Sequence, residues 1–267
     1  MIRKPVVAGQ FYPQTEASLK KMLASLVDTA SEKQDAKGLI LPHAGYVYSG
    51  PVAGATISKV AVKKTVVILG ADHTGSGSPF SVARKDSWLT PLGEVKIDTE
   101  IAEAILRSGD LLKDDSQSHA NEHSIEVELP FLQYVRSDVK IVPIIVSRAD
   151  VKKYQQLAAD ITEGLKKVGR SVTLVASTDF THYESRESAE AKDRLAIEAI
   201  LSLDEEKLSR VVQENRISMC GAAPTCVLLA ACKNIGAKHA GLVKYQTSGD
   251  ITGDYSSVVG YAGMVIW

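Results

Sequence analysis

The run "TVVILGADHTGSG" at residues 65–77 passes from a short apolar stretch straight into an aspartate, a histidine and two glycines. Such a short run, rich in Val, Ile and Leu, is typical of a strand buried on both faces of a sheet. Four other stretches show the same character, namely "GLILP" (38–42), "KIVPIIV" (140–146), "SVTLVAS" (171–177) and "SSVVGYAGMVIW" (256–267). The sequence therefore predicts a sheet built around buried strands.

Helical patterns separate these strands. The spacing of apolar residues predicts helices at 15–29, 51–60, 98–108, 121–135, 150–168, 186–202, 204–214 and 223–235. Strands that alternate with helices predict a largely parallel central sheet with helices on both faces, which is an α/β/α sandwich. The chain has 267 residues, contains no internal repeat, and has only a short linker-like stretch at 31–38. We therefore expect a single domain spanning 1–267.

Composition excludes several classes of protein. The charges nearly cancel, with 31 Lys and Arg against 32 Asp and Glu, which argues against a nucleic-acid partner. No apolar run is long enough to cross a bilayer, and the first residues lack the apolar core of a signal peptide. Three cysteines cannot form a disulfide framework. We expect a cytoplasmic protein with no membrane partner.

Three predicted strands each lead into a histidine. His43 follows the strand at 38–42, His73 follows the strand at 65–70, and Asp179 and His182 follow the strand at 171–177. A single such histidine would most simply be a polar surface residue. Three at equivalent strand ends predict a site, because ligands bind beyond the carboxyl ends of parallel strands and imidazole serves as metal ligand and general base.

The stretch "HANEHSIEVELP" at 119–130 adds a further group of polar residues. On the predicted helix, His123 and Glu126 are three residues apart and lie side by side. We favour a functional role for these two. His119 and Glu128 are interpreted instead as part of an exposed, charged first turn.

Cysteine is rare in this chain, and Cys220 lies directly before a predicted helix start that Pro224 marks. The unpaired N–H groups of a helix N-terminus stabilise a thiolate. Cys226 and Cys232 fall among apolar residues of the same helix and are interpreted as core. Cys220 could therefore join the histidines, as a metal ligand or as a nucleophile.

Several segments together resemble the MEMO family. They include "LPHAGYVYSG", "VVILGADHTG", "NEHSIEVELPFLQY", "STDFTHY" and "SMCGAAPTCVLL", and the matching segments run in order from residue 8 to residue 263. Prokaryotic members of this family are called AmmeMemoRadiSam system protein B. The family is similar in fold to the class III extradiol dioxygenases, so the resemblance implies a LigB-like α/β/α domain.

The resemblance also implies a metal site with redox chemistry. It assigns the metal ligands His43, His73 and Cys220, and the catalytic residues His182, Asp179 and His123. Iron or copper is the expected metal, and zinc is compatible because a thiolate is a softer ligand than the carboxylate of the dioxygenases. The family name implies an AMMECR-type protein and a radical SAM protein as partners.

Three functions remain open on the sequence. The first is a metal-dependent, dioxygenase-like oxidoreductase. The second is a binding or scaffold protein that uses an old dioxygenase pocket for a peptide or phosphorylated ligand, or to hold a partner enzyme. The third is a metal-free enzyme in which Cys220 is the nucleophile and His182 or His123 activates it.

Overall fold

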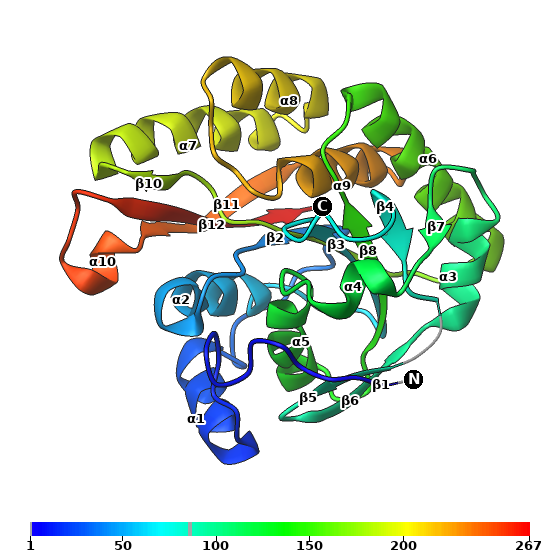
Figure 1. Ribbon diagram of the computed structural model, residues 1–267, viewed down its shortest axis with the longest axis horizontal. Coiled ribbons are helices and arrows are strands. Elements are labelled where there is room, and N and C mark those ends of the chain that lie inside the picture. Colours follow the sequence, from blue (N-terminus) through cyan, green and yellow to red (C-terminus); the bar gives the residue numbers. More distant parts are fainter. Residues whose placement is uncertain (1, 85–86) are drawn as a thin grey trace.

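The computed structural model describes residues 2–84 and 87–267, in which twelve strands form one mixed sheet (Figure 1). The strands are β1 (Ile2–Arg3), β2 (Gly38–Leu41), β3 (Thr65–Ala71), β4 (Phe80–Val82), β5 (Ser87–Thr90), β6 (Gly93–Ile97), β7 (Lys113–Asp114), β8 (Lys140–Val146), β9 (Thr173–Ser177), β10 (His182–Glu184), β11 (Ala240–Thr247) and β12 (Val258–Ile266). Their order is β1-β5-β6-β8-β3-β9-β2-β12-β10, with β11 beside β12, β4 beside β8, and β7 beside β4.

The centre of the sheet is parallel. Strands β6, β8, β3, β9 and β2 all run in one direction, whereas β12 pairs antiparallel with β2. Every residue of β2, β3 and β9 is buried, as expected for strands covered on both faces. The four inner strands predicted from apolar runs are therefore confirmed, and their carboxyl ends meet at one edge.

Helices cover both faces of the sheet. They are α1 (Glu16–Leu26), α2 (Tyr46–Ile57), α3 (Thr99–Leu106), α4 (Gln117–Ala120), the 3-10 helix η1 (Glu126–Glu128), α5 (Leu129–Val135), α6 (Val151–Val168), α7 (Arg186–Leu201), α8 (Glu205–Glu214), α9 (Ala222–Asn234) and α10 (Gly249–Thr252). One layer contains α3, α6, α9, α8 and α7, and the other contains α1, α2 and α5 (Figure 1). The predicted α/β/α sandwich is confirmed.

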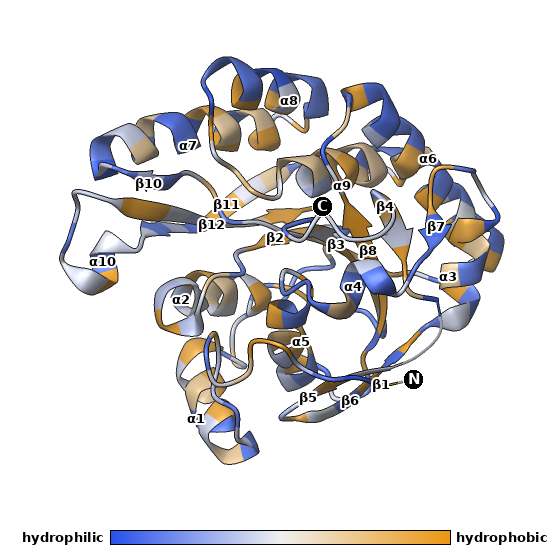
Figure 2. Ribbon diagram, in the orientation of Figure 1, coloured by the Kyte–Doolittle hydropathy of each residue, from blue (hydrophilic) through white to orange (hydrophobic). Residues whose placement is uncertain are grey.

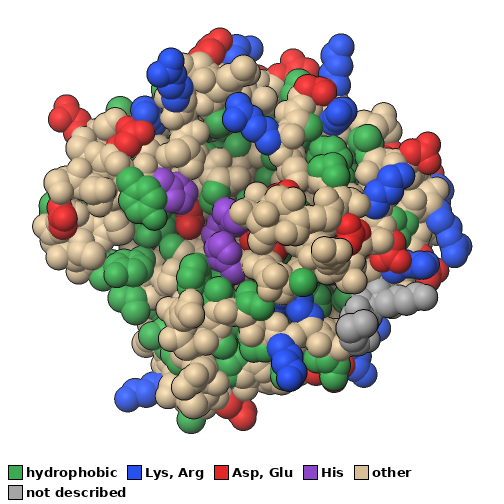
Figure 3. Space-filling model, viewed as in Figure 1, with side chains coloured by type: hydrophobic (Ala, Val, Ile, Leu, Met, Phe, Trp, Pro, Cys, Tyr) green, Lys and Arg blue, Asp and Glu red, His purple; other side chains and the backbone are tan. Residues whose placement is uncertain are grey.

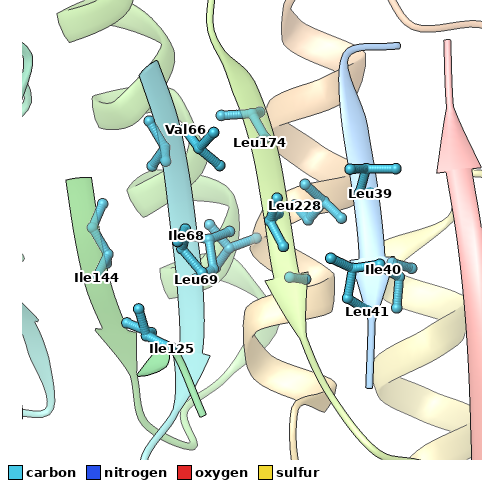
Figure 4. Close-up of a cluster of buried hydrophobic side chains, with 14 of the residues drawn as sticks. Leu39, Ile40, Leu41, Val66, Ile68, Leu69, Ile125, Ile144, Leu174 and Leu228 are labelled. Atoms are coloured by element: carbon cyan, nitrogen blue, oxygen red, sulfur yellow. The ribbon is translucent and has the colours of Figure 1, made fainter. Parts of the chain in front are cut away.

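Apolar side chains fill the space between these layers. Figure 2 shows the inner strands and the sheet-facing sides of the helices in hydrophobic colours, with hydrophilic colours on the outer helices. In the close-up, Leu174 of β9 and Leu228 of α9 lie near each other, and Ile125 lies near Leu69 of β3 (Figure 4). Each fully buried Leu or Ile contributes about 1.5–3 kcal/mol, so this core is a main source of stability.

The helix expected at 121–135 differs most from the prediction. Residues 121–125 form an irregular loop, η1 follows at Glu126–Glu128, and α5 begins only at Leu129. Pro130 stands in the first turn of α5, where the missing N–H costs nothing, so it starts this helix instead of ending one. His123 therefore lies on an irregular loop and not on the helix that the sequence predicted.

Two other differences concern the start of one helix and several short strands. The helix expected at 51–60 begins earlier, at Tyr46, and contains Pro51 in its interior. Short strands such as β4 and β10 were not predicted, because three-residue segments leave no periodic pattern to detect. Among the described residues, no helix is both long enough and apolar enough to span a bilayer.

Candidate metal centre

Three histidines meet beyond the carboxyl ends of β2 and β3. His43 follows β2, His73 follows β3, and His123 lies on the loop at 121–125. One ligand atom from each lies within 4.8 Å of the ligand atoms of the other two. The ring centroids of His73 and His123 are 4.6 Å apart in a stacked arrangement, and His43 meets both rings edge-on. Three imidazoles at this spacing form a group that could hold a metal ion.

A glycine allows the loop at 121–125 to approach the sheet. A Cβ at Gly70 of β3 would lie 2.5 Å from Cγ1 of Ile125 and 2.6 Å from Oγ of Ser124. The Ser124 hydroxyl also donates a hydrogen bond to the carbonyl of Ala71 (3.1 Å). Only glycine at position 70 lets His123 reach the histidines that follow the strands.

His43 is buried, and hydrogen bonds fix both its backbone and its ring. Its backbone N–H donates to Oδ1 of Asp179 (2.9 Å), and its Nδ1 is 2.8 Å from Oγ of Ser177. Burial lowers the pKa of His43 well below the ordinary value, and the positive charges of His73 and His123 lower it further. His43 is therefore a neutral imidazole, which is the form that binds a metal.

Glu122 fixes His73. The backbone N–H of His73 donates to Oε2 of Glu122 (2.7 Å), and Nδ1 lies 2.9 Å from Oε1. Burial acts to raise the pKa of Glu122, but the hydrogen bond from His73 and its charge outweigh burial and lower that pKa to about 2. Burial alone would lower the pKa of His73, yet the hydrogen bond and charge of Glu122 raise it. An ionised carboxylate only accepts, so Nδ1 carries the proton and Nε2 is left for a metal.

His123 is held between Glu122 and the N-terminal segment. Its Nδ1 lies 3.6 Å from Oε1 of Glu122, and the ring of Phe11 packs edge-on against it at 5.0 Å. Burial lowers the pKa of His123, which keeps this imidazole neutral as well. The resemblance assigned His123 to the catalytic residues and not to the metal ligands; the structure places its ring within the compact histidine group that could hold a metal.

Cys220 approaches the site through His43. Its Sγ lies 3.3 Å from Nε2 of His43, and the backbone N–H of Asp179 donates to the same sulfur (3.2 Å). Burial raises the pKa of the Cys220 thiol to about 12, and the Asp179 carboxylate adds to that rise. The backbone N–H groups of Asp179 and Gly221 do lower this pKa, the latter as expected at the start of α9, but burial outweighs them. Cys226 and Cys232 are buried in α9, as predicted for core residues.

Asp179 and His182 line the same pocket. Burial raises the pKa of Asp179 to about 6, close to neutrality. Nδ1 of His182 lies 2.9 Å from the carbonyl oxygen of Ser218, and a carbonyl can only accept. Nδ1 therefore carries the proton, and Nε2 of His182 is free to accept another from a ligand.

The histidines lie at the bottom of an open cavity of about 540 Å³. Figure 3 shows histidine side chains in a hollow near the centre of this face, with hydrophobic side chains around it. Aromatic side chains that line this cavity include Phe11, Tyr48, Tyr183 and Tyr261. Tyr183 is 78% exposed and has a positive φ of 59°, so it is held in a strained backbone conformation at the mouth. A second cavity of about 780 Å³ reaches Cys220 from another side, past Ser218 and Ala222.

Three residues of the stretch at 119–130 have surroundings that the sequence did not indicate. Glu126 accepts from Arg3 and from the Tyr12 hydroxyl (both 2.7 Å), so it anchors the N-terminal segment. Glu128 and His119 are buried, and the prediction that they are exposed is wrong. Burial lowers the pKa of His119 to about 4. The predicted α-helix did not indicate these contacts, because Glu126 and Glu128 lie in the 3-10 helix η1.

Glu122 and Ser177 were also missed as supports of the histidines. Glu122 directly precedes His123, and a carboxylate adjacent to a candidate ligand was the available signal. Ser177 is the last residue of β9, one position before the polar segment that follows the strand. Its contact with His43 depends on β9 and β2 being neighbours. No local pattern reports that pairing.

Comparison with known proteins places the chain in a family. The model of the family described as "Memo-like protein" matches residues 3–265. The chain is 43% identical over 279 residues to a MEMO1 family protein of Methanopyrus kandleri, covering 99% of each chain. It is 40% identical over 284 residues to one of Methanococcus maripaludis, covering 100% of each. It is also 40% identical over 276 residues to one of Nitrosopumilus maritimus, covering 99% of each. This chain therefore belongs to the Memo-like family.

Proposed function

We propose that this protein binds one transition metal ion in the histidine pocket and uses it for redox chemistry. The observation that carries the proposal is the group of three ligand atoms, from His43, His73 and His123, within 4.8 Å of one another. The pKa values of His43 and His123 are lowered, so both rings are neutral and ready to coordinate. Glu122 orients His73 in the manner that supports metal-bound imidazoles.

Iron or copper is the metal of this proposal, because zinc supplies no redox chemistry. Imidazole suits iron, copper and zinc, and a nearby sulfur favours copper(I) or zinc. His43 and His73 are shared by both ligand sets under consideration. The third ligand is either His123 or Cys220, whose Sγ lies 3.3 Å from His43. Bound iron or copper would supply one-electron chemistry and open positions for a small ligand.

His182 and Asp179 are proposed to move protons beside that metal. His182 lines the pocket, and its Nε2 makes no hydrogen bond among the described residues, so this atom is the proposed acceptor of a proton from a bound molecule. Asp179 holds the backbone of His43 and has a pKa of about 6, so its charge changes near neutral pH. Together they fit general acid–base catalysis next to a redox metal.

Metal analysis of protein purified without oxygen tests the proposal. Wild type should carry near-stoichiometric iron or copper, and His73→Ala should lose it. Parallel variants His123→Ala and Cys220→Ser then identify the third ligand, because only the true ligand should be required for tight binding. Wild type with no measurable affinity for either metal would refute the function.

A binding role is the second candidate, and the pocket rim favours it. The cavity lining includes the exposed side chains of Tyr48 and Tyr183, and the exposed Val47, Ile251 and Tyr255 adjoin lining residues in the sequence. Such a patch suits contact with a partner protein. We propose an AMMECR-type protein and a radical SAM protein as the partners to test. A pull-down from the native host should recover the same partners with His43→Ala as with wild type if the pocket acts only as a scaffold.

Burial argues against the third candidate, a metal-free cysteine nucleophile. A thiol with a pKa of about 12 is almost entirely protonated at neutral pH. Alkylation of Cys220 by iodoacetamide should therefore be slow without metal. Fast alkylation that added metal does not change would revive the nucleophile.

A further inference from the structure

A buried chain of hydrogen bonds runs behind His43 and ends at Glu128. Oγ of Ser177 lies 2.8 Å from Nδ1 of His43, 2.8 Å from Oε1 of Glu128 and 2.7 Å from the carbonyl oxygen of Ser124. Ser177 and Glu128 are both fully buried. Neither residue lies among those that line the histidine cavity.

The hydroxyl of Ser177 has too few protons for these three contacts unless its neighbours donate. It offers one O–H and two lone pairs, and the Ser124 carbonyl can only accept. All three contacts are satisfied in one arrangement, in which Ser177 donates to Ser124 and accepts from both Glu128 and His43. Glu128 must then carry a proton on Oε1, and His43 must carry its proton on Nδ1.

The surroundings of Glu128 agree with a neutral acid. Its Oε2 is buried and has no hydrogen-bond partner among the described residues, which is far less costly for a neutral carbonyl oxygen than for a carboxylate. Burial raises the pKa of Glu128 well above the ordinary value, and the negative charge of Asp179 acts in the same direction.

We propose that Glu128 is a permanently protonated acid that, through Ser177, fixes the ring proton of His43 on Nδ1 and so leaves the Nε2 lone pair for the metal site. Glu128 and Ser177 are thus positioning residues. The inference rests on the proposed metal function for its purpose, but the state of Glu128 itself does not require a metal. The two histidines are thus oriented by groups of different charge. An ionised carboxylate, Glu122, contacts His73 directly, whereas a neutral acid, Glu128, acts on His43 through the Ser177 hydroxyl.

Infrared spectroscopy tests the protonation directly on the metal-free wild type. A difference spectrum of wild type against Glu128→Gln at neutral pH should contain the carbonyl stretch of a protonated, buried carboxylic acid. In the same samples, nitrogen NMR of the histidines should show His43 with its proton on Nδ1. Absence of the acid band would overturn the proposal without reference to any metal.

Three variants then test the consequence for metal affinity. Glu128→Leu and Ser177→Ala should each weaken copper or iron binding by roughly 10–100-fold, because loss of a support for a ligating histidine has effects of this size. Glu128→Gln should stay close to wild type, because its neutral amide N–H can still donate to Ser177. If Glu128→Leu fails to fold, Ser177→Ala and the infrared band still decide.

Thr65→Val is the matched control. Thr65 is also buried, and its hydroxyl donates to the carboxylate of Asp98 (2.6 Å) on a different element. This variant should lose stability but keep the infrared band, the His43 proton and the metal affinity. Equal affinities for wild type, Glu128→Leu and Ser177→Ala would overturn the positioning role. Failure of wild type to bind metal, with the acid band present, would instead refute only the proposed function.

Discussion

At the scale of single residues, a side chain beside the histidines can fix their position and protonation. Glu122 is the clearest example, because one carboxylate holds the backbone and the ring of His73 and accepts from the backbone N–H of Ser124 (2.8 Å). Its position between two ligand candidates links the ligand that follows β3 to the one on the loop. A residue outside the ligand group would therefore affect how tightly these histidines hold a metal.

The first prediction is that Glu122→Gln weakens metal binding by about 10–100-fold. The amide keeps the shape of the side chain but removes the negative charge that favours the Nδ1–H form of His73. Competition with a chromophoric chelator measures the affinity. Glu100→Gln, which alters a surface ion pair with Arg170 (3.0 Å), is the control and should bind like wild type. Equal affinities for the two variants would contradict this role of Glu122.

The second prediction concerns pH and His119. The pKa of His119 falls from 6.5 to about 4 on folding because burial disfavours the charged ring. The unfolded chain therefore binds this proton first as pH falls. The contribution to the free energy of unfolding is fully present above pH 6.5 and is lost between pH 6.5 and about 4. Its size is about 3 kcal/mol.

Urea unfolding at a series of pH values checks this. The stability of His119→Gln should decline less steeply than that of wild type between neutrality and pH 4. Parallel declines would show that His119 does not carry this proton linkage.

At the scale of elements, the N-terminal segment supports the loop at 121–125. Arg3 stacks on Trp88 at 4.0 Å and donates to the carbonyl oxygens of His119 and Glu122 as well as to the Glu126 carboxylate. The backbone N–H groups of Val6 and Val7 also donate to the Glu126 carboxylate. The segment that includes Phe11 is thereby pinned against the loop that carries His123.

The third prediction is that Arg3→Met destabilises the fold by about 3 kcal/mol, because it leaves the buried Glu126 carboxylate without its cation. Adding Glu126→Gln to the same chain should restore part of the loss, since the unpaired charge is then gone. Chemical unfolding of the single and double variants measures both effects. Additive losses in the double variant would show that the pair is not coupled.

The start of α9 is the second element that the site depends on. A Cβ at Gly221 would lie 2.4 Å from Cβ of Thr178 and 2.5 Å from the carbonyl oxygen of Ser177. The close approach of Gly221 to β9 is what brings Cys220 beside His43. Backbone atoms cannot yield as a flexible side chain can, so this position tolerates only glycine.

The fourth prediction follows from that contact. Gly221→Ala should destabilise the protein by about 1–3 kcal/mol, as overpacking does. Gly45→Ala is the matched control, because its Cβ would meet only ordinary contacts, the first at 3.7 Å. Gly45 is the N-cap of α2, and its replacement by Ala should lower the free energy of unfolding by less than about 1 kcal/mol. Urea unfolding distinguishes them, and equal costs would contradict the packing argument.

At the scale of the whole molecule, binding of a metal by the three histidines would add to the free energy of folding. The three histidines come from separate parts of the chain, so the unfolded chain holds no such site. The fifth prediction is that copper or iron at a hundredfold excess over its Kd raises the stability by about 2.7 kcal/mol. For a protein of this size the Tm should rise by roughly 5–10 °C.

Differential scanning fluorimetry without oxygen measures that shift. The shift should vanish in His73→Ala, whose unfolding without metal serves as its own baseline. A shift of the same size in wild type and His73→Ala would mean that the metal binds elsewhere.

The sequence by itself determined the inner strands, most of the helices and the histidines that follow β2 and β3. These depend on local patterns, because a buried strand is a short apolar run and ligands gather where such strands end. The family was equally visible, since its motifs are contiguous segments of the chain. The loop at 121–125 was not, because its conformation is set by Gly70, Arg3 and the sheet rather than by its own residues.

Only the tertiary structure decided which groups support the histidines and in which charge state. Ser177 reaches His43 because β9 and β2 are neighbours, and Glu128 reaches Ser177 from η1. Burial likewise raises the pKa of the Cys220 thiol to about 12, whereas its position before α9 in the sequence predicted a lowered pKa. These hydrogen-bond partners and pKa values depend on contacts between distant segments and on removal of water from the site. The spacing of residues along the chain predicts neither.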